Sequence, residues 1–361
     1  MNYVLEQASE RLYLKIILVT VLCALFVSGC SGNEEANKST EIRTITDMTG
    51  RTVFLPVAVT RVASNGGAID EWFLLLGAQE KMVSTSTRTK MNPWYEKIYP
   101  GIKNIAPTFH NSGVNLEKLL KARPDVVLVL SGIEAQEKLA EVGIPLVVLE
   151  RRNPRELKAG ITLTGKVLGS AEARAAAEFC AYYDENIHRI TERTASLSRE
   201  ERKKVYLGGG PDALRTEGKN SLVTSWIEIA GGINAAAQAG ISGIGRQVSA
   251  EAVIKWNPDV IILTERAAKA EVLQSGRWRD INAVKNGRVY VNPRGIYLWS
   301  VRSAEEALQI LWAAKVIHPE LFADLDMVAE VRKFHKKFYK YDLTADEAGR
   351  MLLALPPDSK G

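Results

Sequence analysis

The feature that most constrains the fold is a unit that occurs twice in the chain. The first copy runs from Leu116 to Leu128 and the second from Ala250 to Ile262. In each copy an amphipathic segment is followed by a proline, then an aspartate, Asp125 or Asp259, and then a run of apolar residues. The proline ends a helix, and a continuous apolar run is typical of a strand that is buried on both faces. The repeat therefore predicts two similar α/β lobes.

Strands and helices are predicted to alternate around both copies. After a hairpin over 42–56, we expect strands over 61–64, 81–85, 125–130 and 144–149, then over 205–208, 259–264 and 287–291. The helices expected between them cover 68–76, 116–122 and 134–142, then 222–230, 250–256 and 303–316. This alternation is typical of parallel strands joined by crossover helices. The predicted fold class is α/β, with two Rossmann-like lobes whose central sheets are mostly parallel.

The segment between the lobes predicts a connecting helix. Apolar residues recur at helical spacing over 153–196, so a helix of up to ~40 residues, or ~60 Å, could join the lobes as a stiff rod, with a break allowed near Gly169. The predicted organisation is an N-terminal lobe over 42–152, the single long linking helix over 153–196, and a C-terminal lobe over 197–361. A helical extension ends the second lobe, with Val331, Phe334, Phe338 and Tyr341 at core-packing spacing.

The N-terminus has the pattern of an export signal. Arg11 and Lys15 precede an uncharged stretch over 16–29, which is too short to span a bilayer and is followed by Cys30. The four residues Val27-Ser28-Gly29-Cys30 resemble the lipobox of bacterial lipoproteins, in which the cysteine is lipidated. We expect a lipoprotein signal peptide over 1–29, lipidation at Cys30 and a flexible tether over 30–41, which places the protein outside the cytoplasm on a lipid anchor. An ordinary signal peptide with a chance cysteine is the alternative.

Composition disfavours several functions. The 47 Lys and Arg residues exceed the 42 Asp and Glu residues by five, but no basic run of five or more occurs, so a nucleic-acid partner is not expected. The histidines are His110, His188, His318 and His335, and Cys180 is the one cysteine left after Cys30. No nucleophilic triad, phosphate loop or dinucleotide motif is evident. We therefore predict no enzymatic activity, no cofactor and no bare metal site, although His110 and Tyr297 are weak candidates for touching a metal.

Polar and aromatic residues follow the predicted strands. In α/β proteins, ligands bind at the carboxyl ends of parallel strands. Guanidinium groups bind carboxylate, phosphate-like and other anionic groups, and aromatic rings offer flat apolar surface. Any single loop arginine could instead be a solvated surface residue. The predicted ligand-binding residues are Asn65, Arg88, Trp94, Ser131, Arg152, Arg215, Arg246, Arg294, Tyr297, Trp299 and Arg302.

Five motifs in this order resemble a known family. They lie at 47–51, 115–125, 216–234, 247–251 and 285–290. The chain resembles, over roughly Ile42 to Leu355, the substrate-binding proteins of ABC importers for ferric siderophores, haem, cobalamin and, in some members, molybdate or tungstate. In this family one long helix joins the two lobes, in agreement with the pattern above.

The resemblance implies an extracytoplasmic lipoprotein that captures an iron-siderophore or related metal chelate between its lobes. It would deliver this small anionic ligand to an ABC permease dimer powered by its ATPase, and act as a monomer. A protein of the same fold that binds molybdate, tungstate or cobalamin is the first alternative, and an extracytoplasmic sensor or enzyme is the second. The resemblance also implies one surface glutamate per lobe that docks on the permease, by position Glu71 and Glu228.

Overall fold

The computed structural model describes residues 41–110, 113–132 and 136–358. Residues 42–361 form one unit by their internal contacts, and this unit is described by itself. The predicted signal peptide, Cys30 and the tether up to residue 40 lie outside the described residues. Within the described residues, no helix combines the length and the apolar composition needed to cross a membrane.

The first lobe is built on a six-stranded sheet, ordered β6-β5-β4-β3-β7-β8. All neighbouring strands are parallel except β5 and β6, and the predicted hairpin, β1 (Ile42–Thr46) with β2 (Thr52–Pro56), precedes the sheet. The strands of the sheet are β3 (Val62–Ser64), β4 (Met82–Ser86), β5 (Ala106–His110), β6 (Gly113–Val114), β7 (Val126–Leu130) and β8 (Leu146–Leu149). The helices are α2 (Ala68–Leu75), α3 (Thr87–Lys90), α4 (Pro93–Ile98), α5 (Leu116–Ala122) and α6 (Gln136–Glu141), with the 3₁₀ turns η1 (Gln79–Lys81) and η2 (Pro100–Asn104).

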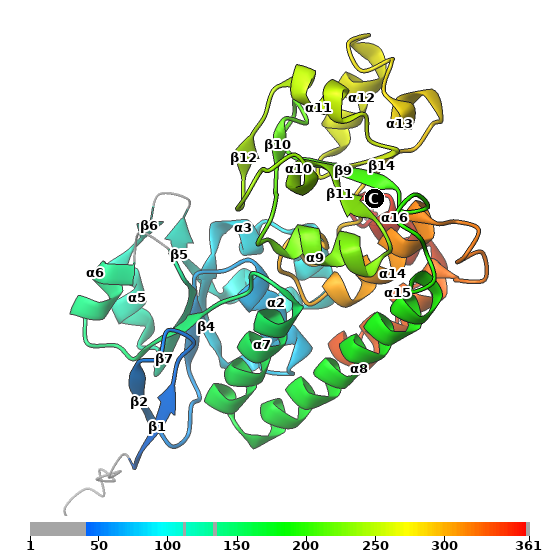
Figure 1. Cartoon of the computed structure of the whole chain (residues 1–361). Coiled ribbons are helices and arrows are strands. Elements are labelled where there is room, and N and C mark those ends of the chain that lie inside the picture. Colours follow the sequence, from blue (N-terminus) through cyan, green and yellow to red (C-terminus); the bar gives the residue numbers. More distant parts are fainter. Residues whose placement is uncertain (1–40, 111–112, 133–135, 359–361) are drawn as a thin grey trace, which may run out of the picture. The chain divides into compact units, whose positions relative to one another are not determined.

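The second lobe repeats this plan around a four-stranded parallel sheet, ordered β11-β9-β13-β14 (Figure 1). Its strands are β9 (Lys204–Gly208), β11 (Ile233–Asn234), β13 (Val260–Leu263) and β14 (Val289–Val291), and a short antiparallel pair is formed by β10 (Arg215–Thr216) and β12 (Arg246–Gln247). Its helices are α9 (Leu222–Ile229), α10 (Ala235–Gln238), α11 (Ala250–Trp256), α12 (Arg266–Gln274) and α13 (Asn282–Lys285). The α/β class with mostly parallel sheets is confirmed.

The repeated aspartate makes the same kind of hydrogen bond in both lobes. Helices α5 and α11 each end on a residue with φ of 45°, in the left-handed region, and the aspartate then opens the following strand. The Asp125 carboxylate accepts the backbone N–H of Arg61 at 2.8 Å, and the Asp259 carboxylate accepts that of Lys204 at 2.9 Å. Each aspartate therefore ties its own strand to the start of the neighbouring one, which explains why the motif occurs twice.

The segment between the sheets is helical, but it is not one straight rod. It consists of α7 (Pro154–Leu168) and the longer α8 (Ser170–Thr194), and α7 packs back along α8 (Figure 1). The turn lies at Gly169, whose φ of 147° suits a glycine, and a Cβ on Gly165 would lie 2.7 Å from the Glu172 carbonyl oxygen. The long linking helix is therefore the 25-residue α8, and the expected length of ~40 residues is wrong because these glycines let the chain fold back closely.

A helical extension completes the chain. It consists of α14 (Glu306–Ile317), α15 (Met327–Phe334), the one-turn π-helix η3 (His335–Tyr339) and α16 (Ala345–Leu352). The rings of Phe334 and Phe338 pack against Tyr182 of α8, with ring centroids 5.8 and 5.3 Å away. The predicted core packing of Val331, Phe334 and Phe338 is confirmed, and Tyr341 is half-buried.

Candidate ligand-binding site

Two small adjoining cavities lie at the carboxyl ends of the first-lobe strands. The first, of about 170 Å³, is lined by the segments that follow β3 and β4, by the end of β5, and by Tyr297 of the second lobe. The second, of about 250 Å³, is lined by the ends of β7 and β8 and by Ile244 and Arg302 of the second lobe. Because Leu130 lines both cavities, they form one site, which we call the cleft site. Its position is the one that parallel-sheet topology favours for a ligand.

A glycine turn shapes the first cavity. Gly66 and Gly67, between β3 and α2, have φ values of 82° and 62°, which L-residues with a side chain rarely adopt. A Cβ on Gly66 would lie 2.1 Å from the Ser86 side-chain oxygen, and one on Gly67 would lie 3.3 Å from the Tyr297 ring. The turn therefore lets the first turn of α2, with its unpaired backbone N–H groups and positive helix dipole, approach the cavity closely.

Asp70 stabilises this turn through hydrogen bonds. Its buried carboxylate accepts hydrogen bonds from the Ser64 hydroxyl at 2.5 Å and from the Thr85 hydroxyl at 2.6 Å. The Ser64 oxygen in turn accepts the backbone N–H of Gly66 at 2.9 Å. Burial raises the pKa of Asp70 to about 6, against the effect of these hydrogen bonds, which lower it.

Two arginines give the second cavity its positive charge. Arg302 has a φ of 63°, in the left-handed region, and its Nη2 donates to the Glu217 carboxylate at 3.2 Å. Its Nη1 atom and the second Glu217 oxygen are buried and find no hydrogen-bond partner among the described residues. Arg151 lines the same cavity; desolvation and the charge of Arg302 lower its pKa to about 9, so it remains a cation at neutral pH. Of these two guanidinium groups, that of Arg302 pairs with the buried Glu217 carboxylate.

The structure brings several of the predicted ligand residues together. Asn65, Arg88 and Tyr297 line the first cavity with His110, and Ser131, Arg152 and Arg302 line the second. The His110 Nδ1 lies 2.7 Å from the Thr87 hydroxyl. Among the described residues no group of three or more His, Cys, Asp or Glu side chains could hold a metal ion.

Other predicted ligand residues lie elsewhere. Trp299 is fully buried and its ring packs into the core, so the prediction is wrong for it. Trp94 is buried as well, with an exposed fraction of 2%, and it lies outside the cleft site, on the wall of the cavity described next. Arg294 lines a separate cavity of about 360 Å³, which also involves Arg88, Trp94 and Tyr297.

Arg215 and Arg246 also fall outside the cleft site. They are exposed on the β10–β12 pair, and neither lines the two cavities described above. Their place near the strand ends was read correctly, but the side chains of a two-stranded ribbon point to alternate faces, and the sequence did not show which face these two take.

Arg151, the neighbour of the predicted Arg152, is more important to the second cavity than Arg152 is. Arg152 is exposed and pairs with Glu156 at 3.2 Å, so its charge is already matched at the rim, whereas Arg151 turns inward. The spacing of Arg152 and Glu156, four residues apart at a helix start, was a signal that could have separated the two arginines. Glu217 was missed as well, and no sequence signal distinguishes it from a surface glutamate.

The two glutamates expected to dock on a permease, Glu71 and Glu228, differ in their exposure to solvent. Glu71 is fully buried, so the prediction of a surface role is wrong for it. Its helix face turns toward the second lobe, and its carboxylate accepts hydrogen bonds from Ser303, Ala304, Glu305 and Tyr339.

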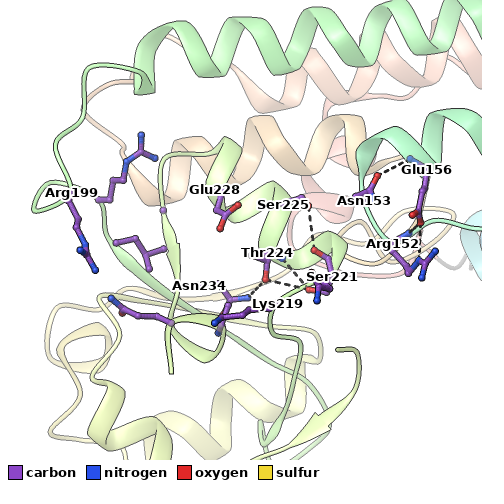
Figure 2. Close-up of a pocket in the computed structure, with 16 residues that line it drawn as sticks. Arg152, Asn153, Glu156, Arg199, Lys219, Ser221, Thr224, Ser225, Glu228 and Asn234 are labelled. Atoms are coloured by element: carbon purple, nitrogen blue, oxygen red, sulfur yellow. Dashed lines mark hydrogen bonds and ion pairs between the residues drawn. The ribbon is translucent and has the colours of Figure 1, made fainter. Parts of the chain in front are cut away.

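Glu228 is exposed on α9, in a polar groove of about 1160 Å³ (Figure 2). Arg199 and Lys219 lie in the same groove, and Arg152 lines both this groove and the cleft site. The groove is open and polar, and it is several times larger than either cleft cavity. A surface role for Glu228 therefore stays a prediction, with a geometry that allows it.

Comparison with known proteins identifies the class. Residues 62–294 match the family model described as periplasmic binding protein. The chain is 28% identical over 360 residues to the molybdate-binding protein MolA of Haemophilus influenzae, covering 92% of this chain and 99% of that protein. The solved structure of MolA bound to molybdate superposes with a TM-score of 0.75 at 27% identity, covering 84% of this chain and 99% of the other.

Other relatives carry different names. An uncharacterized ABC transporter substrate-binding lipoprotein of Bacillus subtilis is 27% identical, covering 84% of this chain and 96% of that protein. An iron(3+)-hydroxamate-binding protein of the same organism is 20% identical, covering 77% of this chain and 88% of that protein.

The chain belongs to the periplasmic binding protein family. As the resemblance in the sequence implied, it is one of the extracytoplasmic substrate-binding proteins of ABC importers, a family of transport proteins and not of enzymes.

The Asp70→Asn variant tests the electrostatics of the glycine turn. The pKa of Asp70 is raised from 3.8 in the unfolded chain to about 6 in the fold, so the folded state binds this proton more tightly. The free energy of unfolding of the wild type should therefore fall as the pH rises from about 4 to about 6, by roughly 3 kcal/mol at most from this group. Urea unfolding at several pH values should show a smaller fall for Asp70→Asn.

Asp346→Asn provides the control, because Asp346 is exposed on α16. Its unfolding curve should follow that of the wild type at every pH. Parallel pH profiles for the wild type and Asp70→Asn would contradict a raised pKa at Asp70.

Proposed function

We propose that this protein binds a small oxyanion of the molybdate or tungstate kind and delivers it to an ABC permease. The observation that carries the proposal is the pair of guanidinium groups, Arg151 and Arg302, that line a cavity of about 250 Å³. A small oxyanion could accept hydrogen bonds from both arginines, including the buried Nη1 of Arg302, which has no partner among the described residues.

Size and shape support an oxyanion over the bulky chelate first expected from the sequence. The two cleft cavities measure about 170 and 250 Å³, and the two tryptophans expected to face a chelate are in the core. The relative named for molybdate binding spans nearly the whole chain, which agrees with the same choice.

A metal chelate remains the second candidate. The neighbouring cavity of about 360 Å³ is lined by Leu298, Val301 and Leu355 together with Arg88 and Arg294. Since Arg88 and Tyr297 line both this cavity and the cleft site, a larger ligand with apolar and anionic parts could occupy the two together.

Arginine variants test the oxyanion. Arg151→Ala or Arg302→Ala should weaken molybdate binding, measured by titration calorimetry, by roughly 30-fold or more, because each removes a desolvated cation that faces the anion. Arg246→Ala is the matched control, since this exposed arginine lies outside both cavities, and its Kd should equal that of the wild type.

The same titrations decide between the two candidates. If molybdate and tungstate give no heat with the wild type while a ferric hydroxamate does, the oxyanion assignment is wrong and the chelate assignment takes its place.

We further propose that Glu228 docks on the permease. It is exposed on α9 and is not engaged in a salt bridge with any described residue. Glu228→Lys should abolish molybdate-dependent uptake by cells while leaving the Kd of the purified protein unchanged, because charge reversal at a docking contact acts only in the complex. Glu185→Lys, an exposed position on α8, serves as the control and should retain uptake. Weakened ligand binding by Glu228→Lys would refute a pure docking role.

Anchoring through Cys30 completes the proposed function. Lipid chains on this cysteine would hold the protein at the outer face of the membrane, since each buried CH₂ group contributes about 0.8 kcal/mol to membrane binding. Cys30→Ser should move the protein from the membrane fraction to the soluble fraction after cell fractionation. Finding the wild type already in the soluble fraction would indicate an ordinary signal peptide.

A further inference from the structure

Glu71 connects helix α2 with two segments that are far from it in sequence. Its Oε1 accepts hydrogen bonds from the Ser303 hydroxyl at 3.0 Å, the Glu305 backbone N–H at 3.0 Å and the Tyr339 hydroxyl at 2.8 Å. Its Oε2 accepts the Ala304 backbone N–H at 3.1 Å. Four donors, two of them backbone groups, therefore converge on one buried carboxyl group.

The segment that Glu71 holds carries the second-lobe side of the cleft site. Arg302 directly precedes Ser303 in the chain and is kept in the left-handed region, with a φ of 63°. A non-glycine residue in this region is strained by about 1 kcal/mol or more, and it persists only where the surroundings fix it. The hydrogen bonds to Glu71 begin at the very next residue.

A second carboxylate extends the connection to Tyr297. Glu305 accepts the backbone N–H groups of Ile296 at 3.3 Å and of Tyr297 at 3.1 Å. The Nε2 atom of His335, on the π-helix η3, lies 3.3 Å from the same carboxylate. The 296–305 segment is thus closed into a loop by Glu305 and fastened to the first lobe by Glu71. It carries Tyr297 and Arg302, two of the three second-lobe residues that line the cleft site.

We propose that Glu71 is a positioning residue of the anion site, whose buried carboxylate holds the 296–305 segment against α2 so that Arg302 and Tyr297 face the first-lobe strand ends. This inference rests on the proposed function, because it names how the anion-binding arginine is kept in place. Glu71 acts through Ser303, Ala304 and Glu305, and it lines neither cleft cavity.

Binding measurements on two variants test the role. Glu71→Gln places an amide N–H₂ among four donors, and Tyr339→Phe removes one donor from the far side without touching the cleft site. Glu71→Gln sets an amide donor against buried donors, and Tyr339→Phe leaves the buried Glu71 oxygen with one hydrogen bond fewer, so each variant should raise the Kd for molybdate about tenfold, with the binding stoichiometry unchanged. The double variant should lose less than the product of the two single effects, since both remove one interaction.

The control is Tyr341→Phe, a half-buried tyrosine of the same C-terminal segment that contacts Glu347 instead. Its Kd should equal that of the wild type. A role of Glu71 in fold stability alone would lower the melting temperature or the fraction of active protein but would leave the Kd of the folded molecules unchanged. Unchanged Kd values in both Glu71→Gln and Tyr339→Phe would therefore overturn the proposal.

Hydrogen exchange separates this inference from the proposed ligand. In the protein without ligand, amides of the 296–305 segment should exchange faster in Tyr339→Phe and Glu71→Gln than in the wild type or in Tyr341→Phe. If the wild type binds no oxyanion, the proposed function fails, but faster exchange confined to this segment still supports the positioning role. Equal exchange in all four proteins would refute it.

Discussion

The buried carboxyl group of Glu71 links three parts of the chain that lie far apart in the sequence. Helix α2 of the first lobe, the 303–305 segment of the second lobe and the π-helix of the C-terminal extension all meet at it. A buried carboxyl group is stable only when hydrogen bonds replace its hydration, and here four donors do so. Burial and the charge of Glu305 raise the pKa of Glu71 to about 8, and its hydrogen bonds fix the relative arrangement of these segments.

The C-terminal extension strengthens this connection from the outside. Lys97 of α4 pairs with Glu347 of α16 at 2.5 Å, and the Trp94 indole N–H donates to the Leu355 carbonyl at 2.9 Å. The extension therefore starts from the second lobe and returns to the first. A site whose two sides are joined in this way is suited to a small ligand held by fixed charges, because a bulky ligand would require the sides to separate.

The charged groups of the cleft site suggest which kind of ligand it could bind. Glu217 pairs with Arg302, while Arg151 lines the same cavity as Arg302. Burial raises the pKa of Glu217, and the two arginines oppose that shift. A buried donor without a partner is costly, so the Nη1 of Arg302, which has none among the described residues, favours an anion that can reach it.

The sequence by itself determined the α/β class, the two lobes and the edge of the first sheet at which the two cleft cavities lie. These follow from local patterns: apolar runs with period-breaking prolines, the repeated aspartates Asp125 and Asp259, and the topological rule that parallel strands end at one edge. The sequence also predicted Ser131 and Arg302 as site residues, and both line the second cavity.

Only the tertiary structure decided which side chains face that edge. Adjacent residues point in opposite directions, so the choice between Arg151 and Arg152 depends on what each one meets, and Arg152 meets Glu156. Whether Glu71 is a surface contact or a buried one depends on segments more than 200 residues away in the chain, since its partners begin at Ser303. Contacts between residues so distant leave no local pattern in the sequence. The local pattern around each partner, such as its helical or strand spacing, is the same whether or not the contact forms.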